Sequence, residues 1–463
     1  MQREKFSSRL GFILISAGCA IGLGNVYRFP IITGAYGGAL FVLIYLAFLL
    51  LLGIPVMCAE LSVGRASQRS IASSFQQLEK PGQKWHWMQY LGIGGNYLLM
   101  MCYTTIAGWM LIYFGKYLSG SIFTVGTETA ALGAHFGETV GNTGLIMGTT
   151  AATIAICLLI CSLGLQKGVE RVTKYMMIAL FVLIVGLAVY CCTLPGAGDG
   201  LKFYLIPSAE NLKNIDIGTV ITAAMGQAFF TLSVGIGSIA IFGSYISKDR
   251  SLMGEAVTIT ALDTFIAIAS GFIIFPACFT YAGGVDADAS SVGASFLFTT
   301  LSGIFNSMGD VAGRIFGTLF FLFMIFAAFS TVIAVFENII SFWLEKTKLS
   351  RPVICLINLG LIFVLSLPAV FSLSIWDHIA IPGIGGFLDM EDFVVSNLLL
   401  PIGSLVYVLF CTCRYGWGWK NFREEVNSGK GLKFPHWLRI YMSFVLPVII
   451  LALMVYSLVG KFI

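Results

Sequence analysis

Long apolar stretches, separated by short polar ones, run along almost the whole chain. Each is about as long as the roughly 20 residues that a helix needs to cross a bilayer, or longer. The stretches cover residues 10–36, 39–64, 88–118, 144–163, 169–193, 216–246, 253–282, 314–344, 353–371, 393–413 and 438–460. This pattern predicts an all-α polytopic membrane protein with eleven transmembrane helices in a single domain, residues 1–463.

Composition supports this class. Of the 463 residues, 57% are apolar and only 11% are charged, which is more apolar surface than a water-soluble core can hide. Eleven cysteines are scattered along the chain without the paired Cys or His spacing of a metal site, so we interpret them as small buried hydrophobes. The lipid bilayer is the expected environment, and nothing indicates a nucleic-acid partner.

The basic residues predict the orientation. With the N-terminus placed in the cytoplasm, 21 of the 27 Lys and Arg residues fall in segments between spans on the inner side, as the positive-inside rule requires. The six exceptions are Arg28, Lys116, Lys202, Lys213, Arg314 and Lys461. We therefore predict a multi-pass protein of the cell (plasma) membrane with a cytoplasmic N-terminus and an extracellular C-terminus. Two long connections, 194–215 and 283–313, lie outside, and residues 291–305 are apolar enough for a short helix or an amphipathic surface loop.

Two spans are interrupted by glycines at corresponding positions. The first contains GCAIGLGNVYRFP at 18–30 and the sixth GQAFFTLSVGIGSIAIFGSY at 226–245. One such cluster alone would favour tight helix packing through small residues. Two clusters in register favour discontinuous helices 1 and 6 of a 5+5 inverted repeat with a binding site near the midplane. The repeats would be residues 10–193 and 216–413, with 438–460 as an additional helix.

Ionisable residues inside spans point to a pathway or a partner. For Glu60 and Glu337 we favour helix packing or a place along the cytoplasmic exit. Asp263 has no basic residue nearby in the sequence, so a cation is a reasonable partner. Hydroxyl oxygens suited to a hard cation are available from Thr231, Ser330 and Thr331.

At this point the sequence resembles a known family, the neurotransmitter:sodium symporters with the LeuT fold. The resemblance covers nearly the whole chain and is carried by RLGFILISAGCAIGLGNVYRFP (9–30), GIPVMCAELSVGR (53–65), GQAFFTLSVGIGS (226–238), TALDTFIAIASGFIIFP (260–276) and LDMEDF (388–393). Eleven spans resemble the bacterial amino-acid transporter branch. The resemblance implies sodium-coupled uptake of an amino acid or amine by alternating access, and no enzymatic activity.

The resemblance also implies two sodium sites and a substrate site. The first sodium site would use Ala20, Asn25, Thr231 and Asp263, completed by the substrate carboxylate. The second would use Gly18, Ile21, Ala327, Ser330 and Thr331. The substrate would be bound by Ala20, Gly22, Leu23, Gly24, Leu99, Tyr103, Phe230, Thr231, Ser233, Ile236, Thr331 and Val335.

The resemblance also limits the class of substrate and the ions that we expect. Amine transporters that resemble this chain carry aspartate in place of Gly22, so glycine favours an amino acid, and the uncharged pocket favours a neutral, hydrophobic or aromatic one. Chloride-dependent relatives carry asparagine in place of Asp263, so we expect sodium but no chloride requirement. Another small amine or zwitterion, a non-transporting receptor and a channel stay open as alternatives. GAGD at 196–199 leaves an intramembrane aspartyl protease as a remote one.

Gates follow from the same resemblance. On the outside, Arg28 and Asp392 would pair above the substrate while Phe230 closes over it. On the inside, Arg3 and Glu345 would pair near Tyr245 with Phe6 beneath, although an ordinary surface ion pair is an equal alternative. One position departs from the family: Ile178 stands ten residues after Gly168, where many relatives have a proline that weakens span five.

Overall fold

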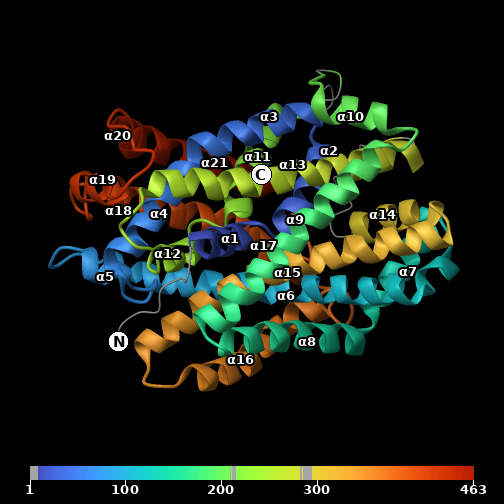
Figure 1. The fold of residues 1–463 in the computed structure, drawn as a ribbon, viewed down its shortest axis with the longest axis horizontal. Helices are drawn as coiled ribbons and strands as arrows, with labels where there is room; N and C mark the ends of the chain where they lie inside the picture. The colour runs from blue at the N-terminus through green and yellow to red at the C-terminus, as the bar shows by residue number, and fades with distance from the viewer. Residues whose placement is uncertain (1–8, 209, 211–214, 282–283, 285–294, 463) are drawn as a thin grey trace.

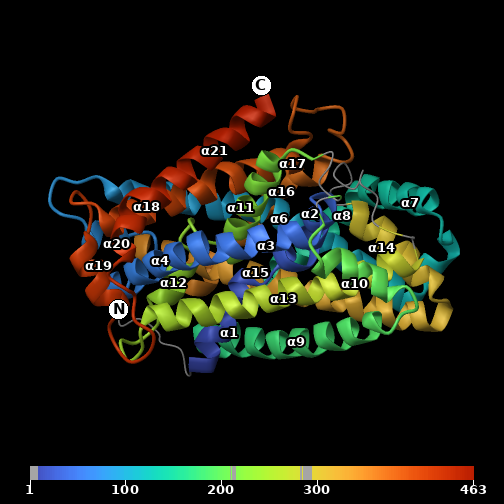
Figure 2. The ribbon, with the colours of Figure 1, turned by 90° about the horizontal axis from the view of Figure 1, so that it is seen from above.

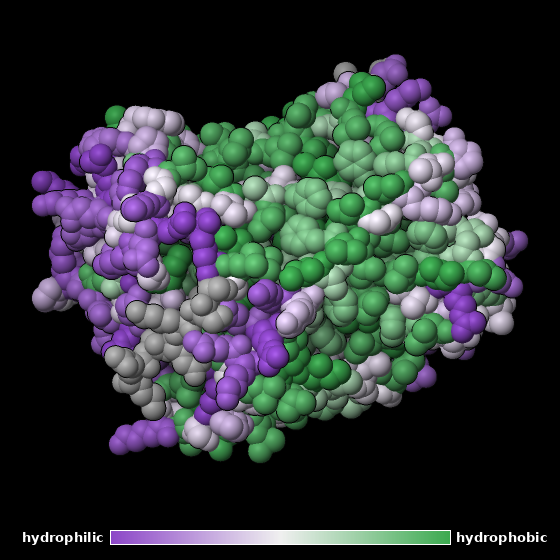
Figure 3. All heavy atoms as spheres, in the orientation of Figure 1, coloured by the Kyte–Doolittle hydropathy of each residue, from purple (hydrophilic) through white to green (hydrophobic). Residues whose placement is uncertain are grey.

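The protein is a bundle of helices that run mostly along one long axis (Figure 1). The computed structural model describes residues 9–462 except 209, 211–214, 282–283 and 285–294. On the face shown in Figure 3, a broad apolar band separates polar surfaces at the two ends. A band of this kind is the surface that lipid tails cover.

Nine helical stretches in the described part of the chain are long and apolar enough to cross a membrane. They comprise α3 (Ala39–Phe48), η2 (Leu49–Gly53) and α4 (Ile54–Ser67); η3 (Trp85–Trp87) and α6 (Met88–Ser119); α8 (Thr143–Ser162); η5 (Leu165–Glu170) and α9 (Arg171–Cys192); α13 (Leu252–Tyr281); α15 (Asp310–Lys346); α16 (Arg351–Phe371); α17 (Phe387–Val394), η8 (Val395–Leu399) and α18 (Leu400–Thr412); and α20 (Leu438–Ile440), η9 (Tyr441–Val445) and α21 (Leu446–Phe462).

The two remaining predicted spans are the two that carry glycine clusters. The first is a bent pair, with α1 (Arg9–Ala20) followed, after a 52° bend, by η1 (Gly24–Arg28) and α2 (Phe29–Ala35). The other consists of α11 (Ile217–Leu232) and α12 (Ser238–Gly243), each too short to count as a span alone. The predicted breaks are therefore present, whereas the count of eleven membrane crossings stays a prediction.

Local sequence explains the break between α11 and α12. Ser233 has φ 51° and accepts the left-handed conformation, while Gly235 (φ 105°) and Gly237 (φ 83°) adopt backbone angles that side chains rarely allow. A Cβ at Gly235 would also lie 2.3 Å from the Leu400 carbonyl oxygen. Glycine is therefore required here both for conformation and for close approach of α18.

α15 is the central helix of the bundle, with most of its apolar stretch buried. It packs against α1, α6 and α9, whereas α9 and α21 run along opposite edges of the view in Figure 2. The start of the fifth predicted span is a π-helical turn, η5, around Gly168, and α9 then continues unbroken through the exposed Ile178. The irregular turn of this span thus lies at Gly168. Ile178, where many relatives have a proline, lies within regular α-helix.

Shorter helices cover the two ends. One end carries η4 (Ser121–Val125), α7 (Thr129–Gly141), α10 (Ala197–Leu205) and α14 (Ser295–Ser307); the other carries α5 (Ser74–Leu78) and α19 (Trp419–Val426). We call the second the basic end, because the predicted inner clusters of Lys and Arg lie there. α14 confirms a short helix in the second long connection, and it packs against α7 and α15.

A buried ion pair ties the basic end together. Arg65 is fully buried at the end of α4, and its Nε donates to Glu425 Oε1 of α19 at 2.6 Å. Its Nη1 donates to the Arg250 carbonyl oxygen at 2.7 Å, and Lys248 Nζ lies 3.0 Å from Glu425 Oε2. The segment before the last span is thereby fixed to α4 and to the connection between α12 and α13.

Candidate functional site

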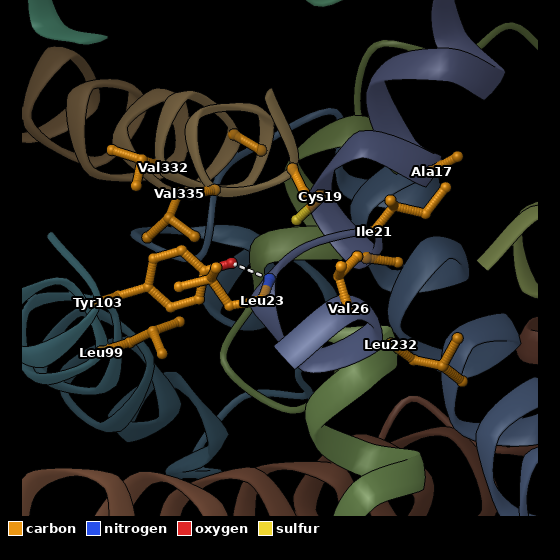
Figure 4. Close-up of a cluster of buried hydrophobic side chains, with 14 of the residues drawn as sticks. Ala17, Cys19, Ile21, Leu23, Val26, Leu99, Tyr103, Leu232, Val332 and Val335 are labelled. Atoms are coloured by element: carbon orange, nitrogen blue, oxygen red, sulfur yellow. Dashed lines mark hydrogen bonds between the residues drawn. The ribbon is translucent and has the colours of Figure 1, made fainter. Parts of the chain in front are cut away.

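The break after α1 turns backbone groups toward the bundle centre. The Leu23 amide donates to the Tyr103 hydroxyl at 2.7 Å, as drawn in Figure 4, and the Gly22 amide donates to Asn25 Oδ1 at 3.1 Å. A broken helix leaves such groups without intrahelical partners, and in a membrane they must be satisfied by side chains or ligands. The break therefore presents polar atoms at a place where the surrounding residues are apolar.

A central cavity of about 10 Å³ lies between the two breaks. Its lining consists of Ala20, Gly22, Gly24, Leu99, Tyr103, Phe230, Ser233, Thr331 and Leu400. Eight of these nine are predicted substrate residues. This volume is about that of one water molecule, so the side chains around the cavity must move apart to admit an amino acid.

The rest of the predicted substrate set lies outside that lining. Val335 stands beside Tyr103 in Figure 4, and Thr231 faces Asp263. The Ile236 carbonyl oxygen accepts from Asn96 Nδ2 at 2.8 Å, and Ile236 Cγ2 would be 2.8 Å from a Cβ at Gly95. Ile236 therefore packs against α6. Leu400, in contrast, lines the cavity and was not predicted, because one leucine among many in an apolar span carries no recognisable signal.

The first predicted sodium set converges on a buried carboxylate. Asn25 Nδ2 donates to Asp263 Oδ1 at 2.8 Å, and the Thr231 hydroxyl lies 3.1 Å from Oδ2. Asp263 is fully buried and has no basic partner in the part of the chain that the structure describes. An uncompensated buried carboxylate is costly, and carboxylate, amide and hydroxyl oxygens are ligands that hard cations prefer. Ala20, the fourth member, borders the adjoining cavity.

The second predicted sodium set also comes together. The Ser330 hydroxyl lies 3.2 Å from the Ile21 carbonyl oxygen and 2.9 Å from that of Ala327. The Thr331 hydroxyl lies 3.3 Å from the carbonyl oxygens of both Gly18 and Ile21. Two hydroxyls and three carbonyls thus meet where α1 ends against α15, and this all-oxygen donor set suits sodium.

The predicted outer gate residues contact one another. Arg28 Nη1 lies 3.2 Å from Asp392 Oδ1 and donates to the Ser396 hydroxyl at 2.8 Å, and the guanidinium carbon is 4.5 Å from the centre of the Phe230 ring. A second cavity of about 270 Å³ is lined in part by Arg28 and Asp392 and by Tyr103 and Phe230. Phe230 and Tyr103 therefore border both the central cavity and a larger outer one.

The predicted inner gate is described only in part. Arg3 and Phe6 lie outside the described residues. Glu345 accepts from the Ser70 amide at 2.7 Å and from the Ser73 hydroxyl at 2.5 Å.

Tyr245 is anchored through a different acid. Its hydroxyl donates to Glu337 Oε1 at 3.0 Å, and Glu337 also pairs with Arg351. Glu337 of α15 thus links Tyr245, two residues after α12, to α16 at the basic end, which agrees with the packing interpretation.

Glu60 holds the second break, a role that the sequence did not predict. Its carboxylate accepts from the amides of Gly235 at 2.7 Å, Ile239 at 3.0 Å and Ala240 at 3.3 Å. A carboxylate at a helix N-terminus accepts hydrogen bonds from amides that have no partner within the helix. Its negative charge is also stabilised by the positive end of the helix dipole. The only signal was an acidic residue inside a span, which did not reveal these partners.

The features now described define a class of protein. A membrane-spanning bundle with two broken helical segments around an oxygen-rich central site is a secondary transporter. The particular family is equally plain: the chain belongs to the sodium:neurotransmitter symporter family, whose family model matches residues 3–124 and 128–461.

Individual relatives match nearly the whole chain. The chain is 31% identical to an uncharacterized sodium-dependent transporter, YhdH, of Bacillus subtilis (strain 168), over 96% of both chains. It is 30% identical to an uncharacterized sodium-dependent transporter of Haemophilus influenzae, over 99% of this chain and 98% of the other. The protein is thus a sodium-dependent transporter.

A solved structure agrees with the fold. The crystal structure of MhsT in complex with L-phenylalanine matches at a TM-score of 0.85 and 34% identity, over 98% of this chain and 99% of that one. The fold is therefore the LeuT fold. The protease alternative fails, because the family consists of transporters and Asp199 of GAGD is an exposed residue that pairs with Lys202 at 3.2 Å.

Proposed function

We propose that the protein couples the entry of two sodium ions to the uptake of a neutral, hydrophobic or aromatic amino acid across the plasma membrane, without a chloride requirement. The observation that carries the proposal is the central cavity, whose lining contains no charged side chain and adjoins both oxygen clusters. The similarity to MhsT, whose structure contains L-phenylalanine, supports this substrate class.

The carboxylate and the ammonium group of an amino acid would bind different backbone groups at the helix breaks. The carboxylate would bind the Leu23 and Gly24 amides and the Tyr103 hydroxyl, because helix N-terminal amides favour anions. It would also complete the first sodium site. The ammonium would bind the carbonyl oxygens at Ala20, Phe230 and Thr231, with Ser233 nearby. Because the substrate carboxylate would itself be a ligand of the sodium ion, the ion and the substrate each strengthen binding of the other.

Alternating access follows from the positions of the gates. Arg28, Asp392 and Phe230 would separate to open the outer cavity to the central one and close again over the substrate. The interactions of Tyr245 and Glu345 would then break to open the basic end, which we place in the cytoplasm together with the N-terminus. The C-terminus would be extracellular.

Chloride independence rests on Asp263. Its carboxylate supplies a fixed negative charge beside the first sodium set, so an added anion is unnecessary for charge balance. Release of sodium would leave this carboxylate without a cation, and we propose that a proton can take that place on the return step.

Uptake by purified protein in proteoliposomes tests the function. We expect accumulation of labelled L-phenylalanine above its external concentration when sodium is high outside, no accumulation when choline replaces sodium, and no change when gluconate replaces chloride. Competition by unlabelled amino acids and amines would rank the substrates. Absence of concentrative uptake for every amino acid would favour a receptor or channel, and competition by amines alone would favour the amine alternative.

A further inference from the structure

The end of α1 encloses the second sodium set. The Gly18 and Ile21 carbonyl oxygens accept hydrogen bonds from Thr331 of α15. A Cβ built at Gly18 would lie 3.1 Å from Thr173 Cγ2 of α9 and 3.3 Å from Ser330 Cβ of α15, so α1 packs closely against both helices here. α1 lies nearer the basic end than α2 (Figure 1). A sodium ion that leaves this set toward the basic end therefore requires α1 to move away from α9 and α15.

Two buried acids contact the first turn of α1. Glu255, in the first turn of α13, accepts from Arg9 Nε at 3.1 Å through its Oε1. Glu170, the last residue of η5, is placed so that a Cβ at Gly11 would overlap its Oε1. Both acids are buried, and α1 packs against α13, α9 and η5, as can be followed in Figure 2. The start of α1 is therefore held between an acid from α13 and an acid from η5.

These contacts differ from those of the predicted inner gate. The Tyr245 hydroxyl donates to Glu337 of α15, and Glu345 of α15 accepts from the chain just before α5. Each of those contacts joins α15 to another segment at the basic end, whereas Glu170 and Glu255 contact α1 itself. Movement of α1 must therefore break the contacts of Glu170 and Glu255.

Acidic side chains suit a contact that has to open. Burial against α1 takes water away from both carboxylates, which is costly even with a basic partner such as Arg9. When α1 leaves, water returns to the carboxylates, and their regained hydration offsets part of the lost contact. An apolar contact would gain nothing from that exposure. The two acids thus stabilise the closed position of α1 without making it permanent.

We propose that Glu170 and Glu255, which we call the α1 clamp, hold α1 in its closed position and set how readily the basic end opens to release sodium. This inference rests on the proposed alternating access. The two acids are positioning residues, because they act on the second sodium set through α1, which carries Gly18. Because Glu170 belongs to the π-helical turn around Gly168, departure of α1 also frees that turn.

Two substitutions weaken the clamp from opposite sides. Glu255→Gln keeps the shape of the side chain and removes the charge that pairs with Arg9. Gly11→Ala displaces the Glu170 carboxylate, although alanine favours helix more than glycine does. Helix propensity alone would slow hydrogen exchange in α1, so faster exchange in Gly11→Ala has to come from the displaced carboxylate. The readout is hydrogen exchange of the amides of α1 and η5 in detergent-purified protein, with and without sodium.

The expected change is local and reversed by sodium. Without sodium, the amides of α1 should exchange at least threefold faster in both variants than in the wild type, while those of α21 are unchanged. The amides of η5 should follow those of α1 in Gly11→Ala. Saturating sodium should restore wild-type protection, because the ion would hold the Gly18 carbonyl oxygen against α15. Gly186→Ala in α9, where a Cβ would meet no atom within 4 Å, should exchange like the wild type.

A double variant tests the ion pair itself. Arg9→Gln should raise the exchange of α1 about as much as Glu255→Gln. Because both substitutions remove the same interaction, the double variant should be no more affected than either single variant. Additive effects would show that Arg9 and Glu255 act independently, which contradicts the clamp.

Substrate binding distinguishes the clamp from a damaged site. The sodium concentration for half-maximal binding of labelled L-phenylalanine should rise at least threefold in Glu255→Gln and Gly11→Ala, because sodium must also draw α1 back. Binding at saturating sodium should equal that of the wild type. Unchanged exchange in α1, faster exchange throughout the protein, or lost binding at saturating sodium would overturn the clamp. Absence of sodium-dependent binding in the wild type would overturn the proposed function, and the clamp with it.

Discussion

Asn25 Nδ2 donates to Asp263 Oδ1 at 2.8 Å, which joins the break after α1 to the middle of α13. The Asn25 carbonyl oxygen also accepts from the hydroxyl of Ser270, seven residues after Asp263 in α13, at 2.9 Å. The backbone that would bind the substrate is therefore held against the helix that carries the buried carboxylate. Changes of charge at Asp263 should act on sodium, substrate and anion together.

The first prediction replaces that charge. In Asp263→Asn, the amide keeps the shape and loses the negative charge, so a chloride ion should be needed to balance the bound sodium. We expect sodium-driven uptake to be weak in gluconate medium and to recover when chloride is added, whereas the wild type responds to neither change. Robust, chloride-insensitive uptake by the variant would show that Asp263 does not replace an anion.

The second prediction concerns space at Gly22. A Cβ at this position would lie 2.3 Å from the Tyr103 hydroxyl and 2.4 Å from Thr331 Oγ1. Gly22→Ala must therefore displace side chains of both the substrate site and the second sodium set. We expect substrate binding to weaken at least about tenfold, or ~1.4 kcal/mol, as measured by scintillation proximity binding.

A glycine in an open position provides the control. A Cβ added at Gly226 of α11 would meet no atom within 4 Å. Gly226→Ala should therefore bind substrate like the wild type. Equal affinity of the Gly22→Ala and Gly226→Ala proteins would contradict the close approach at Gly22.

The third prediction concerns the second break. Glu60 accepts from the amide of Gly235, between α11 and α12, and from the amides of Ile239 and Ala240 in the first turn of α12. Glu60→Gln replaces one acceptor oxygen with a donor NH₂ group, which faces other donors. We expect a loss of about 1–3 kcal/mol in stability, observed as a lower midpoint in a thermal unfolding assay, together with weaker substrate binding. Glu128→Gln, at an exposed position before α7, should leave both unchanged; an unaltered Glu60→Gln protein would refute the role of this carboxylate.

The fourth prediction is a pH effect at the end that carries α7. Burial and the adjacent Lys116 ammonium lower the pKa of His135 below its usual value, and Lys116 Nζ lies 2.8 Å from His135 Nε2. The neutral ring accepts this hydrogen bond and the protonated ring cannot. The stabilisation is therefore present above the usual histidine pKa of about 6.5 and is lost as the pH falls below it.

Hydrogen exchange can detect this change. We expect amides of α7 to exchange faster at pH 5.5 than at pH 7.5, after correction for the intrinsic pH dependence of exchange. His135→Gln keeps an acceptor that does not titrate, so its corrected protection should be the same at both pH values. Faster exchange in the variant at low pH would assign the effect to another group.

The residues of the two sodium sets illustrate what the sequence can predict. The motifs that contain Gly18, Asn25 and Asp263 carry the resemblance to a known family, and it is this resemblance that implied the two sets; polarity alone indicated broken helices and a cation partner for Asp263. Leu400 and Ile236 are ordinary apolar residues, and which of them lines the cavity depends on helix rotation. Only the three-dimensional packing decides this: Leu400 faces the cavity, whereas Ile236 packs on Gly95.

The glutamates show a second limit. Glu60 and Glu337 were both recognisable as buried acids, but their partners are distant along the chain. The Gly235 amide is 175 positions from Glu60, and Tyr245 is 92 from Glu337. A local pattern indicates that a buried acid needs a partner, and the fold determines which group supplies it.

The Arg65–Glu425 pair has a consequence for the order in which the protein is made. Its two residues are 360 positions apart, so most of the polypeptide must leave the ribosome before Arg65 meets its carboxylate. Until then the guanidinium has to stay hydrated, and α4 cannot settle into its final burial. We expect the helices to stay loosely packed in the membrane until α19 is synthesised and Glu425 pairs with Arg65. A protein truncated before residue 419 should therefore be inserted into the membrane but degraded.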